Sequence, residues 1–262
     1  MSEPDLKFAA NLRWLFPDLP LDRSIPAAAE EGFRGVEIPA PYEHPPQQLR
    51  RLLDGAGVAA VLLNTPQGPA GSPTANGAAC LPGYGPQFRS GVERGLEYAE
   101  ALGCPRLHVV AGRRPTEVSR ERAFAHYVHN IGWAAERARA TGVRLVVEMQ
   151  NQRDVPGFVV ESQAAAAAVA EAVGEPVRLL FDVYHTQVTE GDVVRTFDAV
   201  LPLVEHIQIG DAPTRSEPGT GELSWSFVFG HIRRSGYTGW LGCEFRPDQS
   251  AAGVLTRLSE LI

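Results

Sequence analysis

Short apolar runs alternate with longer helical stretches eight times along this chain, and this alternation constrains the fold more than any other feature. The runs that we interpret as strands are residues 7–12, 35–38, 58–64, 106–111, 144–149, 177–183, 204–209 and 239–245. They are continuously apolar rather than alternating, which is typical of a parallel sheet covered on both faces. Eight strand–helix repeats predict an α/β fold, the (β/α)8 TIM barrel.

The clearest helical segments are residues 86–102, 117–140 and 161–173, and a glycine follows each of them, as glycine often does at helix ends. A chain of 262 residues has the usual length of one such barrel, so we predict a single domain over 1–262. The longest irregular piece, residues 65–85, is long enough to suggest an active-site cover. Whether it closes over a substrate is left open by the sequence.

Four of the apolar runs end in an oxygen-bearing side chain that a core strand does not ordinarily carry. These residues are Glu148, Asp182, Gln208 and Glu244, spaced by about one strand–helix unit each. A closed barrel would bring them to the same mouth, where three carboxylates and a carboxamide suit a hard divalent cation. Because the set holds no Cys or His, Mg²⁺ or Mn²⁺ is favoured over zinc. The alternative for each carboxylate is a helix cap or a pair with a nearby Arg.

Two further residues follow these strand ends. His185 lies three positions after Asp182, where it could donate to a substrate oxygen. Arg215, in the segment DAPTRSEPGTGE, could hold a substrate carboxylate through a bidentate contact, or it could be an ordinary surface residue.

Other polar residues on the predicted strands have less definite roles. We interpret His108 as a core or supporting residue. Glu37 and Asn64 end their strands and could face the pocket or orient another side chain. Cys243 is expected to be a packed core residue, because no neighbouring His or Arg marks it as an activated nucleophile.

Charge and cysteine content exclude several classes of protein. The net charge of −7 argues against nucleic acid as the main partner, although a metal or one Arg can still attract a small anion. Three cysteines without a CxxC motif indicate neither a disulfide scaffold nor structural zinc. The sequence shows no phosphate-binding glycine motif, no signal peptide and no apolar run of the roughly 18–20 residues that span a membrane. We therefore expect a cytoplasmic protein without a membrane partner.

Seven segments of the chain resemble the hydroxypyruvate isomerase family, a branch of the xylose-isomerase-like TIM barrels. They are FAANLRWLF, FRGVEIPAPY, LPGYGPQFRSGV, VEMQNQRDVPGF, FDVYHTQ, HIQIGDAPTRSEPGTGE and YTGWLGCEFRP. The resemblance runs from about residue 7 to residue 247, and the last four segments are the most specific. One departure is EFRP at the end of the eighth strand, where EYKP is familiar, so any role for a phenol at Phe245 is in doubt.

This resemblance implies an enzyme that interconverts hydroxypyruvate and tartronate semialdehyde (2-hydroxy-3-oxopropanoate) through an enediolate. It implies that Glu148 and Glu244 donate and accept the proton, and that His185 and Arg215 contact the substrate. The implied ligands of a Mg²⁺ or Mn²⁺ ion are Glu148, Asp182, Gln208 and Glu244. A homo-oligomer is also compatible with the resemblance.

Other functions remain open on the same residues. A 2-oxo-tetronate isomerase or a ketose 3-epimerase would use the same site with a different oxo-acid or sugar substrate. A repair enzyme similar to endonuclease IV is disfavoured, because the seven His form no cluster and the chain is acidic. A non-catalytic barrel that binds a ligand is disfavoured by the intact set of four ligands.

Overall fold

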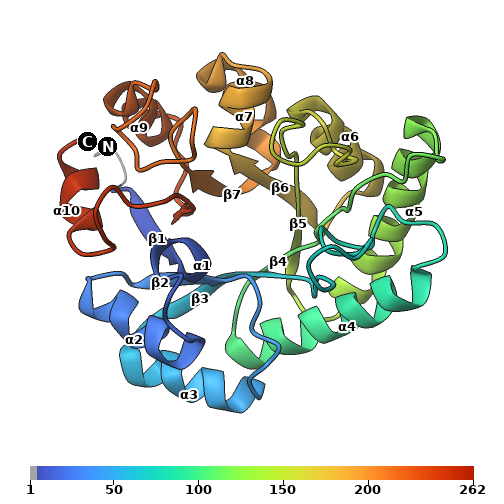
Figure 1. Ribbon diagram of the computed structural model, residues 1–262, viewed down its shortest axis with the longest axis horizontal. Helices are drawn as coiled ribbons and strands as arrows, with labels where there is room; N and C mark the ends of the chain where they lie inside the picture. Colours follow the sequence, from blue (N-terminus) through green and yellow to red (C-terminus); the bar gives the residue numbers. More distant parts are fainter. Residues whose placement is uncertain (1–4) are drawn as a thin grey trace.

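The structure, a computed structural model, confirms the (β/α)8 barrel. It describes residues 5–262. Residues 1–4 lie outside the described residues, and they begin the N-terminal stretch in which we expect no signal peptide. The strands pair in parallel, in sequence order, and the barrel closes between the last strand and the first (Figure 1). Their bounds are β1 Lys7–Asn11, β2 Gly35–Ile38, β3 Ala59–Asn64, β4 Arg106–His108, β5 Arg144–Glu148, β6 Val177–Asp182, β7 Val204–Ile209 and β8 Trp240–Cys243.

Helices surround the sheet as an outer layer in Figure 1. Their bounds are α1 Leu12–Leu15, α2 Leu21–Glu30, α3 Pro46–Ala56, α4 Gly85–Leu102, α5 Arg120–Ala138, α6 Gln163–Val173, α7 Val183–Thr189, α8 Val193–Val200, the 3-10 turn η1 Leu201–Leu203, α9 Trp225–Arg234 and α10 Val254–Ser259. Gly103 ends α4 with a φ of 65°, a left-handed conformation that glycine adopts without strain. Within residues 5–262, no helix has the length and apolar character needed to cross a membrane.

Most predicted strand ends agree with the structure to within one or two residues, but β4 is three residues shorter than predicted. Val109 N–H still donates to Val146 O on β5 over 3.0 Å, but Val110 and Ala111 bond to segments outside the strands. Cys80 N–H donates to Ala111 O over 2.8 Å, and Val159 N–H donates to Gly112 O over 3.1 Å. The helix predicted over 117–140 begins at Arg120, because the Ser119 side chain caps it by accepting from Arg122 N–H over 3.3 Å.

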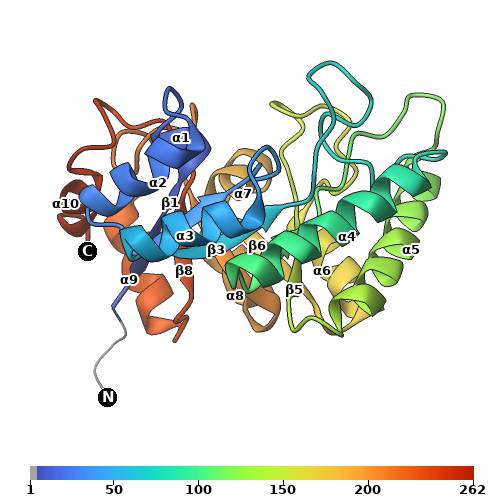
Figure 2. The ribbon, with the colours of Figure 1, turned by 90° about the horizontal axis from the view of Figure 1, so that it is seen from below.

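The interior of the barrel changes from apolar to polar along the strand direction. Leu62, Val146 and Leu180 form a separate buried cluster contributed by β3, β5 and β6. Two residues further along each of these strands come Asn64, Glu148 and Asp182, which share the same face because side chains alternate along a strand. Figure 2 shows the loops after β3 and β5 rising together at one end of the barrel. The polar strand ends therefore lie at this mouth.

Candidate active site

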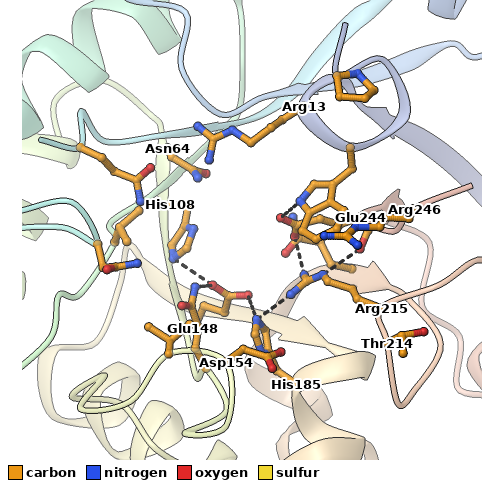
Figure 3. Close-up of a pocket in the computed structure, with 18 of the residues that line it drawn as sticks. Arg13, Asn64, His108, Glu148, Asp154, His185, Thr214, Arg215, Glu244 and Arg246 are labelled. Atoms are coloured by element: carbon orange, nitrogen blue, oxygen red, sulfur yellow. Dashed lines mark hydrogen bonds and ion pairs between the residues drawn. The ribbon is translucent and has the colours of Figure 1, made fainter. Parts of the chain in front are cut away.

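One pocket of about 970 Å³ occupies the mouth of the barrel, and it collects most of the residues predicted from the sequence. Glu148, at the end of β5, Gln208, near the end of β7, and Glu244, directly after β8, line it. Asp182 ends β6 and is only 1% exposed, so it lies beneath the pocket wall rather than on it. The side chains of His185 and Arg215 also line the pocket, and Figure 3 shows them between Glu148 and Glu244.

Arg215 connects the acidic residues on the two sides of the site. Its Nη2 donates to Asp182 Oδ2 over 2.5 Å and lies 2.9 Å from Glu244 Oε2. Its Nε donates to the backbone oxygen of Glu244 over 2.9 Å. The guanidinium carbon lies 5.1 Å from the Trp14 ring centroid and 5.0 Å from that of Tyr184. Arg215 adopts a φ of 55°, a strained conformation for a residue other than glycine, and such strain is common at functional sites.

Burial and mutual repulsion disfavour the charged forms of the carboxyl groups. Burial raises the pKa of Glu148 well above its usual value, and the negative charges of Asp182 and Glu244 raise it further. Burial raises the pKa of Glu244 to about 7, although the positive charge of Arg215 opposes the shift. Burial alone would lower the pKa of Arg215, but the nearby carboxylates raise it above its usual value, so this residue stays charged.

The two histidines of the pocket are neutral. Burial lowers the pKa of His108 to about 3 and that of His185 well below its usual value. The 3.6 Å approach of His108 Nε2 to Glu148 Oε2 is therefore not an ion pair. Both ring nitrogens of His185 face donors: the backbone N–H of Asn151 donates to Nδ1 over 3.2 Å, and Arg215 Nη1 lies 2.8 Å from Nε2. His185 Nε2 also lies 3.9 Å from Glu148 Oε1, so this nitrogen faces the site.

The donor set fits a hard divalent cation. Glu148, Asp182 and His185 each place one ligand atom within 4.8 Å of the other two. When all three carboxyl groups are ionised, their negative charge exceeds the positive charge of Arg215 by two, and a divalent cation would balance this excess. Gln208 donates its amide nitrogen to Glu37 over 2.9 Å, which leaves its oxygen for the pocket. His185 is therefore a candidate ligand beside the oxygen donors that the sequence predicted.

Several pocket residues were not identified from the sequence. Trp14 donates its indole N–H to Glu244 Oε1 over 3.0 Å, and Gln150 donates to Glu148 Oε2 over 2.6 Å. Arg13 and Arg246 lie at the rim of the same pocket. Their position in the sequence could have identified these four residues. Each follows the end of a strand by two or three residues, where βα loops line the mouth of a barrel.

Comparison with known proteins groups this chain with isomerases. Residues 25–260 match the family described as "Xylose isomerase-like TIM barrel". A 2-oxo-tetronate isomerase from Cupriavidus necator is 39% identical over 252 residues, which cover 95% of this chain and 96% of the relative. A hydroxypyruvate isomerase from Escherichia coli K12 is 35% identical over 253 residues, which cover 95% of this chain and 97% of the relative.

Solved structures with the same fold carry more varied titles. A structure from Brucella melitensis titled AP endonuclease, family 2, has a TM-score of 0.92 and 32% identity, covering 98% of this chain and 99% of its own. A D-psicose 3-epimerase has a TM-score of 0.73 and 19% identity, covering 90% of this chain and 84% of its own. The second likeness concerns the fold alone.

Proposed function

Because the chain belongs to the hydroxypyruvate isomerase family of xylose isomerase-like TIM barrels, we propose that it interconverts hydroxypyruvate and tartronate semialdehyde. The observation that carries this proposal is the placement of Glu148 and Glu244 on opposite sides of one buried pocket (Figure 3). Two carboxyl groups on either side of a substrate can remove a proton from one carbon and return a proton to its neighbour.

In the forward direction, one glutamate takes a proton from the hydroxyl-bearing carbon of hydroxypyruvate, and an enediolate forms. The other glutamate delivers a proton to the former carbonyl carbon, while the hydroxyl proton moves from the first oxygen to the second. Either glutamate can take either role, depending on the direction of the reaction. His185, whose Nε2 faces the site beside Glu148, would contact a substrate oxygen during this shift of charge.

A divalent cation, Mg²⁺ or Mn²⁺, is part of the same proposal. Its ligands would be Glu148, Asp182, Gln208 and Glu244, with His185 close enough to join them. When bound, such an ion supplies polarisation of the substrate carbonyl and of the adjacent hydroxyl. We place the enzyme in the cytoplasm, as a monomer or homo-oligomer, with a small-molecule substrate and without a nucleic-acid or membrane partner.

The charge of the rim supports an acid as the substrate. Arg13 and Arg246 are exposed at the pocket, and among the described residues neither forms an ion pair. Arg215 has five N–H groups, and four of them already point to Asp182, Glu244 and His185. One N–H of Arg215 remains for a substrate oxygen, whereas a bidentate contact with a carboxylate would need two free N–H groups. The substrate carboxylate would therefore be held by the two rim arginines.

The same geometry supports 2-oxo-tetronate as an alternative substrate, because the pocket volume leaves room for a fourth carbon. An endonuclease is less well supported. Within residues 5–262, one cluster of His and carboxylate ligands is close enough to hold a metal, and it contains a single His.

Turnover of hydroxypyruvate by metal-stripped protein, with and without Mn²⁺ or Mg²⁺, tests the proposal, with 2-oxo-tetronate assayed in parallel. Glu148→Gln and Glu244→Gln should each lower kcat by about 10²–10⁴-fold, the usual contribution of a general acid or base. The matched control is Glu97→Gln, an exposed position on α4. Activity on the four-carbon acid alone would replace the substrate, and full activity in both pocket variants would refute the mechanism.

A further inference from the structure

Glu37 is a buried acidic residue that the proposed chemistry does not use. It lies on β2 and is 0% exposed. Its Oε2 accepts from Asn11 Nδ2 over 2.7 Å and from Gln208 Nε2 over 2.9 Å. Its Oε1 lies 2.5 Å from His206 Nε2. One carboxyl group therefore joins strands β1, β2 and β7 inside the barrel.

Two strands, β1 and β8, lie between β2 and β7, and Glu37 can reach β7 because β8 contributes no side chain at this level. In the closed barrel β8 lies between β1 and β7, and its Gly242 pairs with Ala9 on one side and Gln208 on the other. A Cβ atom at Gly242 would lie 1.8 Å from Glu37 Oε1. Glycine at this position is thus a condition for the contact between Glu37 and Gln208.

The contact decides which end of the Gln208 amide faces the pocket. An amide has a donor end and an acceptor end, and a carboxylate accepts only. The donor end of Gln208 is held by Glu37, so its oxygen is the group presented to the pocket that this residue lines. Without such a partner the amide could turn and present its nitrogen, which does not bind a cation.

We propose that Glu37 is a positioning residue that fixes the carboxamide oxygen of Gln208 toward the pocket for a divalent cation. The inference rests on the proposed function, because it assumes that Gln208 is a ligand. A partner of this kind behind a metal ligand commonly changes metal affinity by about 10–100-fold when it is removed. Glu37→Gln should raise the dissociation constant for Mn²⁺ by that factor, because an amide at position 37 no longer guarantees an acceptor for Gln208.

Calorimetric titration of the metal-stripped, full-length protein with Mn²⁺ measures this effect without an activity assay. The matched control is Glu205→Gln, on β7, which loses its ion pairs with Arg106 at 3.1 Å and with Arg144 at 3.5 Å. Glu205 is the second residue of β7, at the strand end away from the pocket, so this variant should bind Mn²⁺ like the wild type. Circular dichroism and thermal melting establish that each variant is folded.

Exchanging the two side chains separates positioning from mere structural support. In Glu37→Gln/Gln208→Glu the donor and acceptor change places, the net charge is kept, and position 208 still offers an oxygen. This double variant should recover Mn²⁺ affinity to within several-fold of the wild type, whereas Gln208→Glu alone should not, because two carboxylates would then face each other at 2.9 Å. If Glu37→Gln does not fold, the exchanged variant decides the question by the same titration.

The outcomes are distinguishable. A wild-type protein that binds no Mn²⁺ would refute the proposed cation, and the role of Glu37 with it. A wild type that binds Mn²⁺ while folded Glu37→Gln binds it equally well would refute the role of Glu37 alone. An exchanged variant no better than Glu37→Gln would show that Glu37 supports the barrel without orienting Gln208.

Discussion

Replacing Arg215 with methionine should strongly destabilise the metal-free protein. Its guanidinium lies 2.5 Å from Asp182 and 2.9 Å from Glu244. At an effective dielectric constant of about 20, unit charges across these distances attract by roughly 7 and 6 kcal/mol. Much of this attraction is offset by the cost of burying the charges, so the net loss should be about 3–5 kcal/mol, as is usual when one partner of a buried ion pair is removed.

Urea denaturation in the presence of EDTA measures the free energy of unfolding. The matched control is Arg246→Met, at an exposed residue of the same pocket, which should change stability by no more than about 0.5 kcal/mol. Mn²⁺ at 100 times its dissociation constant should stabilise the wild type by about 2.7 kcal/mol. The same concentration of Mn²⁺ should stabilise Arg215→Met by more than it stabilises the wild type, because the cation would then balance carboxylates that have lost their guanidinium. If Arg215→Met is as stable as Arg246→Met in EDTA, the electrostatic argument is wrong.

Three further predictions concern the core, the thiols and the rim. Leu180→Ala, inside the barrel, should lower the free energy of unfolding by about 2–5 kcal/mol in urea, whereas Leu19→Ala, at a side chain 42% exposed, should change it little. A thiol reagent at pH 8 should modify no cysteine of the folded protein and all three in denaturant, because Cys80, Cys104 and Cys243 are buried with raised pKa values. Arg13→Gln/Arg246→Gln should raise KM for an acid substrate by about 10²–10⁴-fold with little change in kcat, because two charged contacts worth about 1.5–3 kcal/mol each are lost; an unchanged KM would exclude the rim as the carboxylate site.

The barrel was predictable because apolar runs and helical stretches alternate so regularly. Where the prediction was wrong, long-range pairing decided the structure. Residues 109–111 look like the end of a strand, yet Ala111 accepts from Cys80 N–H in a loop 31 positions earlier. The hydrophobicity of residues 109–111 is compatible both with a longer β4 and with a segment that bonds to a loop. The sequence alone therefore did not determine where β4 ends.

The carboxylates of the site were predictable because a charged residue at the end of an apolar run is unusual. Neutral or ambiguous residues gave weaker signals, although they occupy equivalent positions. Polar side chains within one residue of the C-terminal ends of the eight strands include Asn11, Glu37, Asn64, His108, Glu148, Asp182, Gln208 and Glu244. Glu37 and Asn64 were left undecided because their directions depend on strands distant in the sequence, and His108 was expected to be a core or supporting residue although it lines the pocket.

The arrangement of the arginines separates substrate selection from chemistry. Arg215 is committed to Asp182, Glu244 and His185, so changing it alters the charge balance of the whole site. Arg13 and Arg246 carry the same charge at the rim without those commitments. A change at the rim can therefore alter which acid is bound while the interior stays intact. For the same reason, loss of activity in an Arg215 variant cannot by itself identify the carboxylate site, whereas a rise in KM confined to the rim variants can.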